Sequence, residues 1–298
     1  MKTVEDQISA NKRDSILLIG VVSAVLVILF YLFAQIYDPS LVFVFLIIAI
    51  ILSTLGSIAS YWYSDKIVLA VTKTREPTPI EKAHLENVVE GLAIAAGLPT
   101  PRIIISDDNN LNAFATGRDP QHAVLAVTSG LLKTMNREQL EGVVAHEMSH
   151  IKNYDIRFAS MVAVLVGIVA IAAQLFLRSM WFTGGGRGNR RGGGGIAIIF
   201  LLIGIVLAIL APIFTQLIQL AVSRQREYLA DASGAYLTRN PEGLASALET
   251  LRDHNTNEKV NGAVSHLYFV NPLLPKNAES FFATHPPIEE RIRRLREM

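Results

Sequence analysis

The chain has 298 residues, with 27 lysines and arginines against 26 aspartates and glutamates, and it contains no cysteine. The balanced charge argues against a protein that binds nucleic acid through bulk positive charge. The lack of cysteine excludes disulfides, cysteine nucleophiles and thiolate metal sites. Only 18% of the residues are charged, whereas an average soluble domain has about 25%, so the composition indicates membrane segments.

Four long uncharged runs are the candidates for these segments. Each of the first two exceeds the roughly 20 residues with which a helix spans a bilayer. The last two could instead form a buried hairpin of a soluble domain, but such long uncharged runs are unusual in a soluble core. We therefore expect four transmembrane or embedded helices. The runs are Ile16–Tyr37, Leu41–Tyr63, Phe158–Leu177 and Ile196–Leu220.

Basic residues beside the first two runs indicate their orientation. Three precede the first run and three follow the second by residue 75, whereas the turn 38–40 has none. Cytoplasmic flanks are enriched in lysine and arginine, so both flanks should face the cytoplasm. Residues 64–157 and 221–298 then lie on one side, whether the last two runs cross the membrane or not.

The loop 184–195 between the last two runs contains eight glycines and three arginines. Its arginines conflict with the charge rule if both runs span. The composition is typical of a flexible tether. A nucleic-acid-binding segment is the alternative, but the loop is short and has no interleaved aromatic residues, so no nucleic-acid partner is expected.

The remaining residues predict a soluble domain of helices and a small sheet. A capping box at Thr78 and Glu81 begins a helix that ends at Gly97, and Asn136 begins another. Further helices are expected over Arg224–Thr238, from Asn240-Pro241 and from Pro286-Pro287. β-branched or apolar runs predict three strands: Arg102–Ser106, Asn112–Thr116 and Ala123–Thr128.

The sharpest chemical signal is the motif His146-Glu147-Met148-Ser149-His150. Residues four apart lie on one face of a helix, so both imidazoles can reach one ion. Zinc prefers such nitrogen ligands, and Glu147 is placed to take a proton from a water on the metal. A solvated pair of helix histidines is the alternative.

A catalytic zinc needs a third protein ligand, and Glu227 is the candidate. Glu227 and Asp231 are four residues apart in a predicted helix, so they share a face. Asp231 could then accept a hydrogen bond from the far nitrogen of His146 and fix its tautomer. Without the His-Glu-x-x-His motif, Glu227 and Asp231 would be interpreted as part of an ordinary solvated acidic face of a helix. If the intervening residues are helical, His150 and Glu227 each lie within roughly 10 Å of an apolar run, so we expect the site just off the cytoplasmic membrane surface.

Together these features resemble the HtpX family of membrane-bound zinc metalloproteases, relatives of the prenyl-protein endoprotease. The resemblance covers nearly the whole chain. Besides the amino-terminal hairpin, it rests on Asn112–Gly117, the zinc helix with Asn153 and Asp155 after it, Glu227–Asp231 and His285–Arg291.

The resemblance implies an α+β, mostly helical membrane protein whose gluzincin-like protease core has a small three-stranded sheet and one zinc. It implies that His285 and Arg291 face the active site, where both could stabilise an oxyanion. It also implies that Ala123–Val127, comprising Ala123, Val124, Leu125, Ala126 and Val127, is an edge strand that binds extended substrate through its backbone.

The predicted function is therefore a zinc endopeptidase of the bacterial or archaeal inner membrane that cleaves misfolded or damaged membrane proteins at the cytoplasmic face, as part of protein quality control. Two alternatives stay open: a prenyl-protein protease of narrow specificity, and a non-catalytic membrane scaffold with a structural zinc. The expected organisation is a tail and hairpin (1–63), a first protease part (64–156), a second apolar hairpin (157–220) and a second protease part (221–298).

Overall fold

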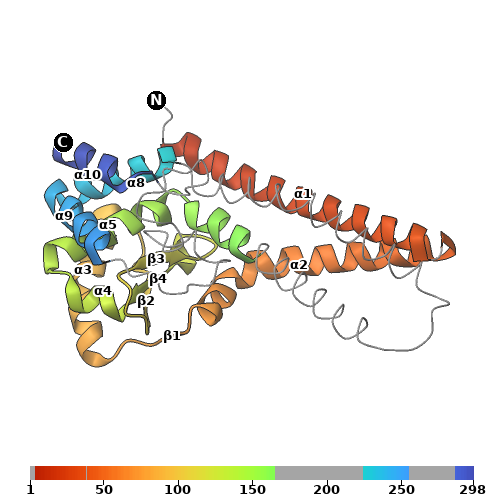
Figure 1. Ribbon diagram of the computed structural model, residues 1–298, viewed down its shortest axis with the longest axis horizontal. Helices are drawn as coiled ribbons and strands as arrows, with labels where there is room; N and C mark the ends of the chain where they lie inside the picture. Colours follow the sequence, from red (N-terminus) through yellow and green to blue (C-terminus); the bar gives the residue numbers. More distant parts are fainter. Residues whose placement is uncertain (1–3, 38, 165–223, 255–285) are drawn as a thin grey trace, which may run out of the picture.

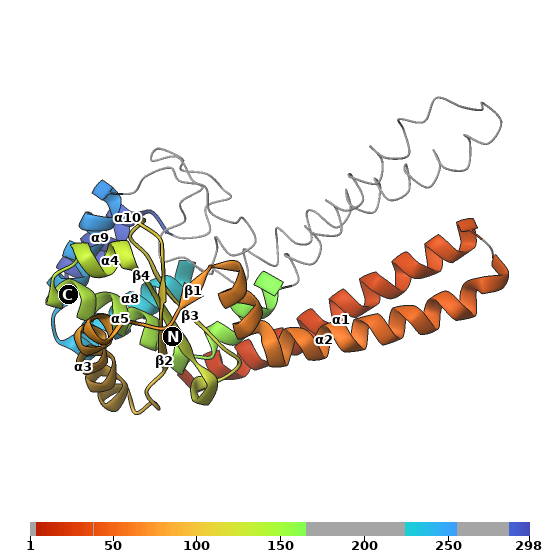
Figure 2. The same cartoon turned by 90° about the horizontal axis from the view of Figure 1, so that it is seen from below.

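Two long antiparallel helices project from a smaller body of helices and strands (Figures 1 and 2). The computed structural model describes residues 4–37, 39–164, 224–254 and 286–298. Helix α1 (Val4–Tyr37) and helix α2 (Val42–Val71) form the projecting hairpin, joined through the short 3-10 helix η1 (Pro39–Leu41). The first two predicted apolar runs lie in these two helices. The third run lies largely, and the fourth run and the glycine-rich loop entirely, outside the described residues.

Helix α2 carries a long apolar surface that the other described residues leave uncovered. Over Pro39–Ala70 the chain is long and apolar enough to cross a membrane, and its most apolar window is only 6% buried. This is the one segment in the described part of the chain that meets that test. Large side chains such as Phe43 and Ile47 are exposed along it. An apolar surface of this extent indicates a membrane or protein partner.

The sheet has four strands, in the order β1-β2-β4-β3. Strands β2 (Arg102–Ser106) and β4 (Val124–Thr128) are parallel, and the outer strands pair antiparallel to them. The prediction of three strands missed β1 (Thr74–Arg75), because two residues are too few to show an alternating pattern. The outer strand on the opposite side is β3 (Ala113–Thr116).

The predicted edge strand Ala123–Val127 is wrong. Strand β4 hydrogen-bonds to β2 on one side and to β3 on the other, so it lies inside the sheet. All five of its residues are buried. Its backbone groups are therefore used within the sheet, and an extended substrate cannot pair with it. The edge nearest the site is β3.

Helix α5 (Arg137–Lys152) lies at the centre of the body and positions the site. It contacts strand β3 and helices α3 (Pro79–Ala96), α8 (Arg224–Thr238) and α9 (Pro241–His254). Its start is fixed by a capping box between Asn136 and Gln139, and a second capping box at Thr78 begins α3. Both boxes were predicted from the sequence. The body also contains α4 (Ser129–Thr134), the 3-10 turn η2 (Pro120–His122) and α10 (Ile288–Arg296), and residues 155–164 are helical.

Glycines let the neighbouring helices pack closely on α5. A Cβ atom at Gly142 would lie 2.8 Å from the backbone of Leu244 in α9. A Cβ atom at Gly234 in α8 would lie 3.1 Å from the backbone nitrogen of His146. The two helices can therefore approach α5 along its length, which brings the side chains of α8 against the His-Glu-x-x-His motif.

Candidate metal centre

His146 and His150 lie one helical turn apart on the same face of α5, and their Nε2 atoms point toward each other. Their Nε2 atoms are 3.1 Å apart, and their rings meet edge to face. The opposite face of α5 carries Val144, Met148 and Ile151, which are buried in the hydrophobic core. Because that face is held by the core, the helix cannot rotate to expose its histidines. His146 is fully buried, and His150 is partly buried.

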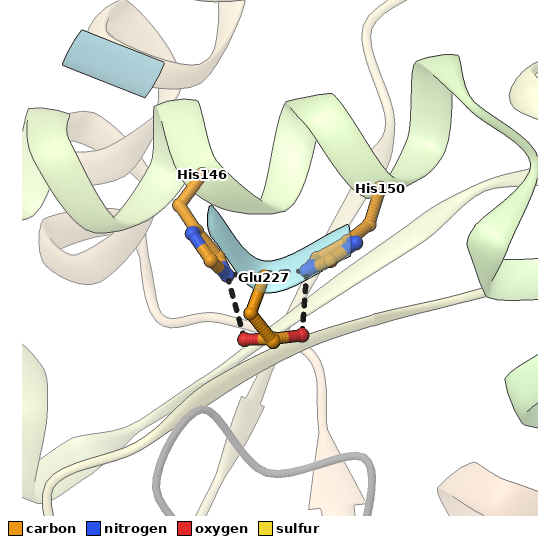
Figure 3. A group of neighbouring side chains, drawn as sticks. All are labelled: His146, His150 and Glu227. Carbon is orange, nitrogen blue, oxygen red and sulfur yellow. Dashed lines mark hydrogen bonds and ion pairs between the residues drawn. The ribbon is translucent and has the colours of Figure 1, made fainter. Parts of the chain in front are cut away.

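Glu227 completes the group from α8 (Figure 3). Its Oε2 atom lies 3.7 Å from Nε2 of His146, and its Oε1 atom lies 3.5 Å from Nε2 of His150. One ligand atom from each residue lies within 4.8 Å of the others. Atoms bound to one tetrahedral zinc at about 2.1 Å lie roughly 3.4 Å apart. The predicted trio His146, His150 and Glu227 therefore fits a single zinc ion, with two nitrogen ligands and one oxygen ligand.

Each histidine has a carboxylate behind it. Nδ1 of His146 lies 2.9 Å from Oδ1 of Asp231, which is the contact that the sequence predicted. Nδ1 of His150 lies 3.0 Å from Oδ2 of Asp155. A carboxylate on the far ring nitrogen turns Nε2 toward the metal and raises the basicity of the ligand. The role of Asp155 was missed, although its place soon after the motif was visible in the sequence.

Arg291 lies behind these ligands, in contact with Asp231. Its Nε donates to Oδ2 of Asp231 at 2.8 Å, and its Nη2 donates to Oδ1 at 2.7 Å. Its Nη1 lies 3.7 Å from Oε2 of Glu227. Although burial raises the pKa of Asp231, the facing guanidinium outweighs it and holds that pKa well below its usual range. These contacts place Arg291 as a partner of two acidic groups, while His285 lies outside the described residues.

Glu147 lies on the side of the motif that faces strand β3. It is buried, and its Oε2 atom accepts a hydrogen bond of 2.9 Å from the backbone N–H of Ala115. Burial raises the pKa of Glu147 to about 7. A carboxyl group with a pKa near the working pH can both accept and return a proton. The predicted general base is therefore in a suitable environment.

The two histidines respond to their surroundings in opposite ways. Burial lowers the pKa of His146. Burial also acts to lower the pKa of His150, but the hydrogen bond that its Nδ1–H donates to Asp155 and the charge of Glu227 outweigh burial and raise that pKa to about 9. In the metal-free protein at neutral pH, His146 is therefore neutral and His150 carries a proton.

The side of β3 opposite β4 faces Glu147. Backbone groups alternate in direction along an antiparallel strand. The carbonyl of Asn112 accepts from the N–H of Thr128 beside β4, whereas the N–H groups of Ala115 and Gly117 point the other way, to Glu147 and Ser160. The backbone groups of Ala113 and Ala115 thus face the general base. The residues of β4, in contrast, pair within the sheet.

Comparison with known proteins decides the family. Residues 79–298, most of the chain, match the sequence family described as Peptidase family M48. This chain belongs to peptidase family M48. It is a metallopeptidase, and the ligand trio and Glu147 all lie within the matched residues.

The relatives within the M48 family confirm the resemblance to HtpX proteases. A Protease HtpX homolog of Dictyoglomus turgidum is 44% identical over 99% of this chain and 95% of its own. One of Caldanaerobacter subterraneus is 43% identical over 100% of this chain and 98% of its own. The crystal structure of S. mikatae Ste24p is 20% identical, with a TM-score of 0.43 over 97% of this chain and 66% of that one.

Proposed function

We propose that this M48 peptidase is a membrane-embedded zinc endopeptidase that cleaves unfolded segments of membrane proteins at the cytoplasmic face. The observation that supports it best is the convergence of His146, His150 and Glu227, with the buried Glu147 beside them. Two imidazoles and one carboxylate leave a position open for water, which is typical of a catalytic zinc site rather than a structural one.

The residues divide the chemistry among them. His146, His150 and Glu227 would hold a zinc ion, which would supply Lewis acidity toward the attacking water and the scissile carbonyl. Glu147 accepts the proton of the attacking water and returns it to the leaving amine. Asp231 and Asp155 hold the imidazoles in the tautomer that directs Nε2 to the metal. Arg291 acts through Asp231 and Glu227, and His285 is the remaining candidate to stabilise the oxyanion.

Strand β3 is the surface on which we place the substrate. An extended peptide that pairs with the outer side of β3 would add one strand to the sheet. Its scissile bond would then pass beside Glu147, which already contacts the backbone of Ala115. Backbone hydrogen bonds do not depend on which side chains the peptide carries. The affinity for a peptide would therefore depend little on its sequence and strongly on its being unfolded.

The hairpin supports the membrane location. Helix α2 exposes its apolar surface, and Trp62 and Tyr63 close its apolar part, as interfacial aromatic residues do. The basic flanks on the body side of the hairpin favour a cytoplasmic site. A protease site at this position is accessible to membrane proteins and their unfolded cytoplasmic segments. We therefore infer a role in protein quality control.

The test is proteolysis of an unfolded model protein by the full-length chain purified in detergent. The protein is stripped with a chelator and assayed with and without added zinc. We expect zinc to restore cleavage, and Glu147→Gln to bind zinc but lose at least about 100-fold in turnover. Glu141→Gln, the same change on an outward turn of α5, serves as the matched control and should cleave normally.

Two other results would overturn the proposal. Cleavage of a prenylated peptide with no action on the unfolded protein would indicate a protease of narrow specificity. Zinc binding with four protein ligands and no cleavage of either substrate would indicate a structural zinc in a scaffold.

A further inference from the structure

The first helix of the hairpin reaches the metal centre through one buried side chain, Asn11. This residue lies in α1 before the apolar run begins, and it is 3% exposed. Its Nδ2 donates to the backbone carbonyl of Asn153 at 2.8 Å and to Oδ1 of Asp155 at 2.6 Å. A buried amide with two short hydrogen bonds to one turn is a specific contact rather than general packing.

The turn that Asn11 holds is the one that places Asp155 behind His150. Oδ2 of Asp155 lies 3.0 Å from Nδ1 of His150, while its Oδ1 accepts from Asn11 and lies 3.4 Å from Nη1 of Arg226. The two oxygens of one carboxylate therefore have separate partners. With Oδ1 held from α1, the carboxylate plane is fixed and Oδ2 stays directed at the ligand.

The backbone of this turn needs such support. Tyr154 has a φ of 62°, a left-handed conformation that is unfavourable for a residue with a Cβ atom. Strained residues persist only where their surroundings hold them. Asn11 binds the carbonyl just before Tyr154, and Nζ of Lys12 lies 4.5 Å from the centre of the Tyr154 ring. Two consecutive residues of α1 thus clamp the turn.

We propose that Asn11 is a positioning residue of the metal centre, which acts through Asp155 to hold His150 in its ligand orientation. The inference rests on the proposed zinc site. It makes the amino-terminal helix a functional part of the peptidase, and not only its attachment to the membrane. A purely structural role, in which Asn11 merely fastens α1 to the body, predicts different results in the experiment below.

The experiment measures zinc affinity by competition with a chromophoric chelator, on full-length protein in detergent. Direct carboxylate partners of ligating histidines contribute about 10- to 100-fold in metal affinity. Because Asn11 acts one step further out, we expect Asn11→Leu to weaken zinc binding by about three- to tenfold. The control is Arg13→Ala on the same helix, whose exposed side chain pairs only locally with Asp14 and which should bind zinc like the wild type.

A double-mutant cycle separates positioning from structure. If Asn11 acts through Asp155, Asn11→Leu should cause no further loss in an Asp155→Asn background. With cobalt in place of zinc, the visible absorption band should shift in Asn11→Leu and not in Arg13→Ala. If Asn11→Leu does not fold, Asn11→Ala, which also removes the amide donor, is measured in the same way.

The outcomes are distinct. Unchanged zinc affinity in the Asn11 variants, or an equal loss with and without Asp155, would overturn the positioning role while the proposed function stands. Failure of the wild-type protein to bind zinc would overturn the proposed function itself.

Discussion

Arg291 illustrates how the chain holds charge beside its proposed metal ligands. The side chain is 1% exposed, and its guanidinium is paired with the carboxylate of Asp231 through two hydrogen bonds. From the sequence alone, it would be an ordinary solvated charge of the last helix, and only the resemblance placed it near the site. Which carboxylate it pairs with could not be predicted, because the two residues come from helices far apart in the chain.

We expect Arg291→Met to destabilise the protein by about 3–5 kcal/mol, because it leaves Asp231 buried without its partner. The free energy of unfolding in detergent, measured by chemical denaturation, tests this. Arg293→Met on the same helix removes a side chain whose ion pairs are exposed and should leave the midpoint unchanged. Equal effects of the two changes would contradict the buried pairing.

The raised pKa of His150 predicts how zinc binding depends on pH. A free histidine has a pKa of about 6.5, and that of His150 in the folded, metal-free protein is about 9. Its ion pair with Asp155 thus stabilises the metal-free fold fully below pH 6.5, and that stabilisation is lost as the pH rises through 9. Zinc must displace this proton.

Apparent zinc affinity should therefore rise about tenfold per pH unit between roughly pH 7 and 9 and level off above. Chelator competition at a series of pH values measures the slope. An affinity independent of pH in this range would show that His150 is already neutral at pH 7.

At the level of elements, the sequence predicted what is local. Capping boxes at Thr78 and Asn136 begin helices in the structure as expected, and spacing alone put His146 and His150 on one face. The order of the strands in the sheet could not be predicted in the same way, because neighbouring strands come from segments that are distant in the chain. An apolar run such as 123–127 suits an edge or a central position equally, so its place in the sheet could not be predicted.

The close approach of α9 to α5 gives a prediction about packing. Gly142→Ala should destabilise the protein by about 1–3 kcal/mol, because the added methyl group meets the backbone of Leu244 and one helix must move. Gly91→Ala in α3 is the control, since nothing lies within 4 Å of a Cβ there. It should stabilise by up to about 1 kcal/mol. Thermal unfolding of both variants in detergent provides the comparison.

At the level of the whole molecule, the proposed topology places the body and the hairpin turn on opposite sides of the membrane. The absence of cysteine makes this easy to test, because each introduced thiol is unique. Ser40→Cys in the turn should react with a membrane-impermeant maleimide on intact spheroplasts. Glu86→Cys, on the exposed face of α3, should react only after permeabilisation. The reverse pattern would place the site outside the cytoplasm.

The proposed metal ligands come from distant parts of the chain, and this has a consequence for biogenesis. Translation delivers the two histidines of α5 early, Glu227 only after the third and fourth apolar runs, and Arg291 later still. A nascent chain therefore carries the motif before the metal centre can form. We expect the growing polypeptide to be inert toward itself and toward its neighbours at the translocon until α8 and α10 have docked, so proteolytic competence is gained only as synthesis nears completion.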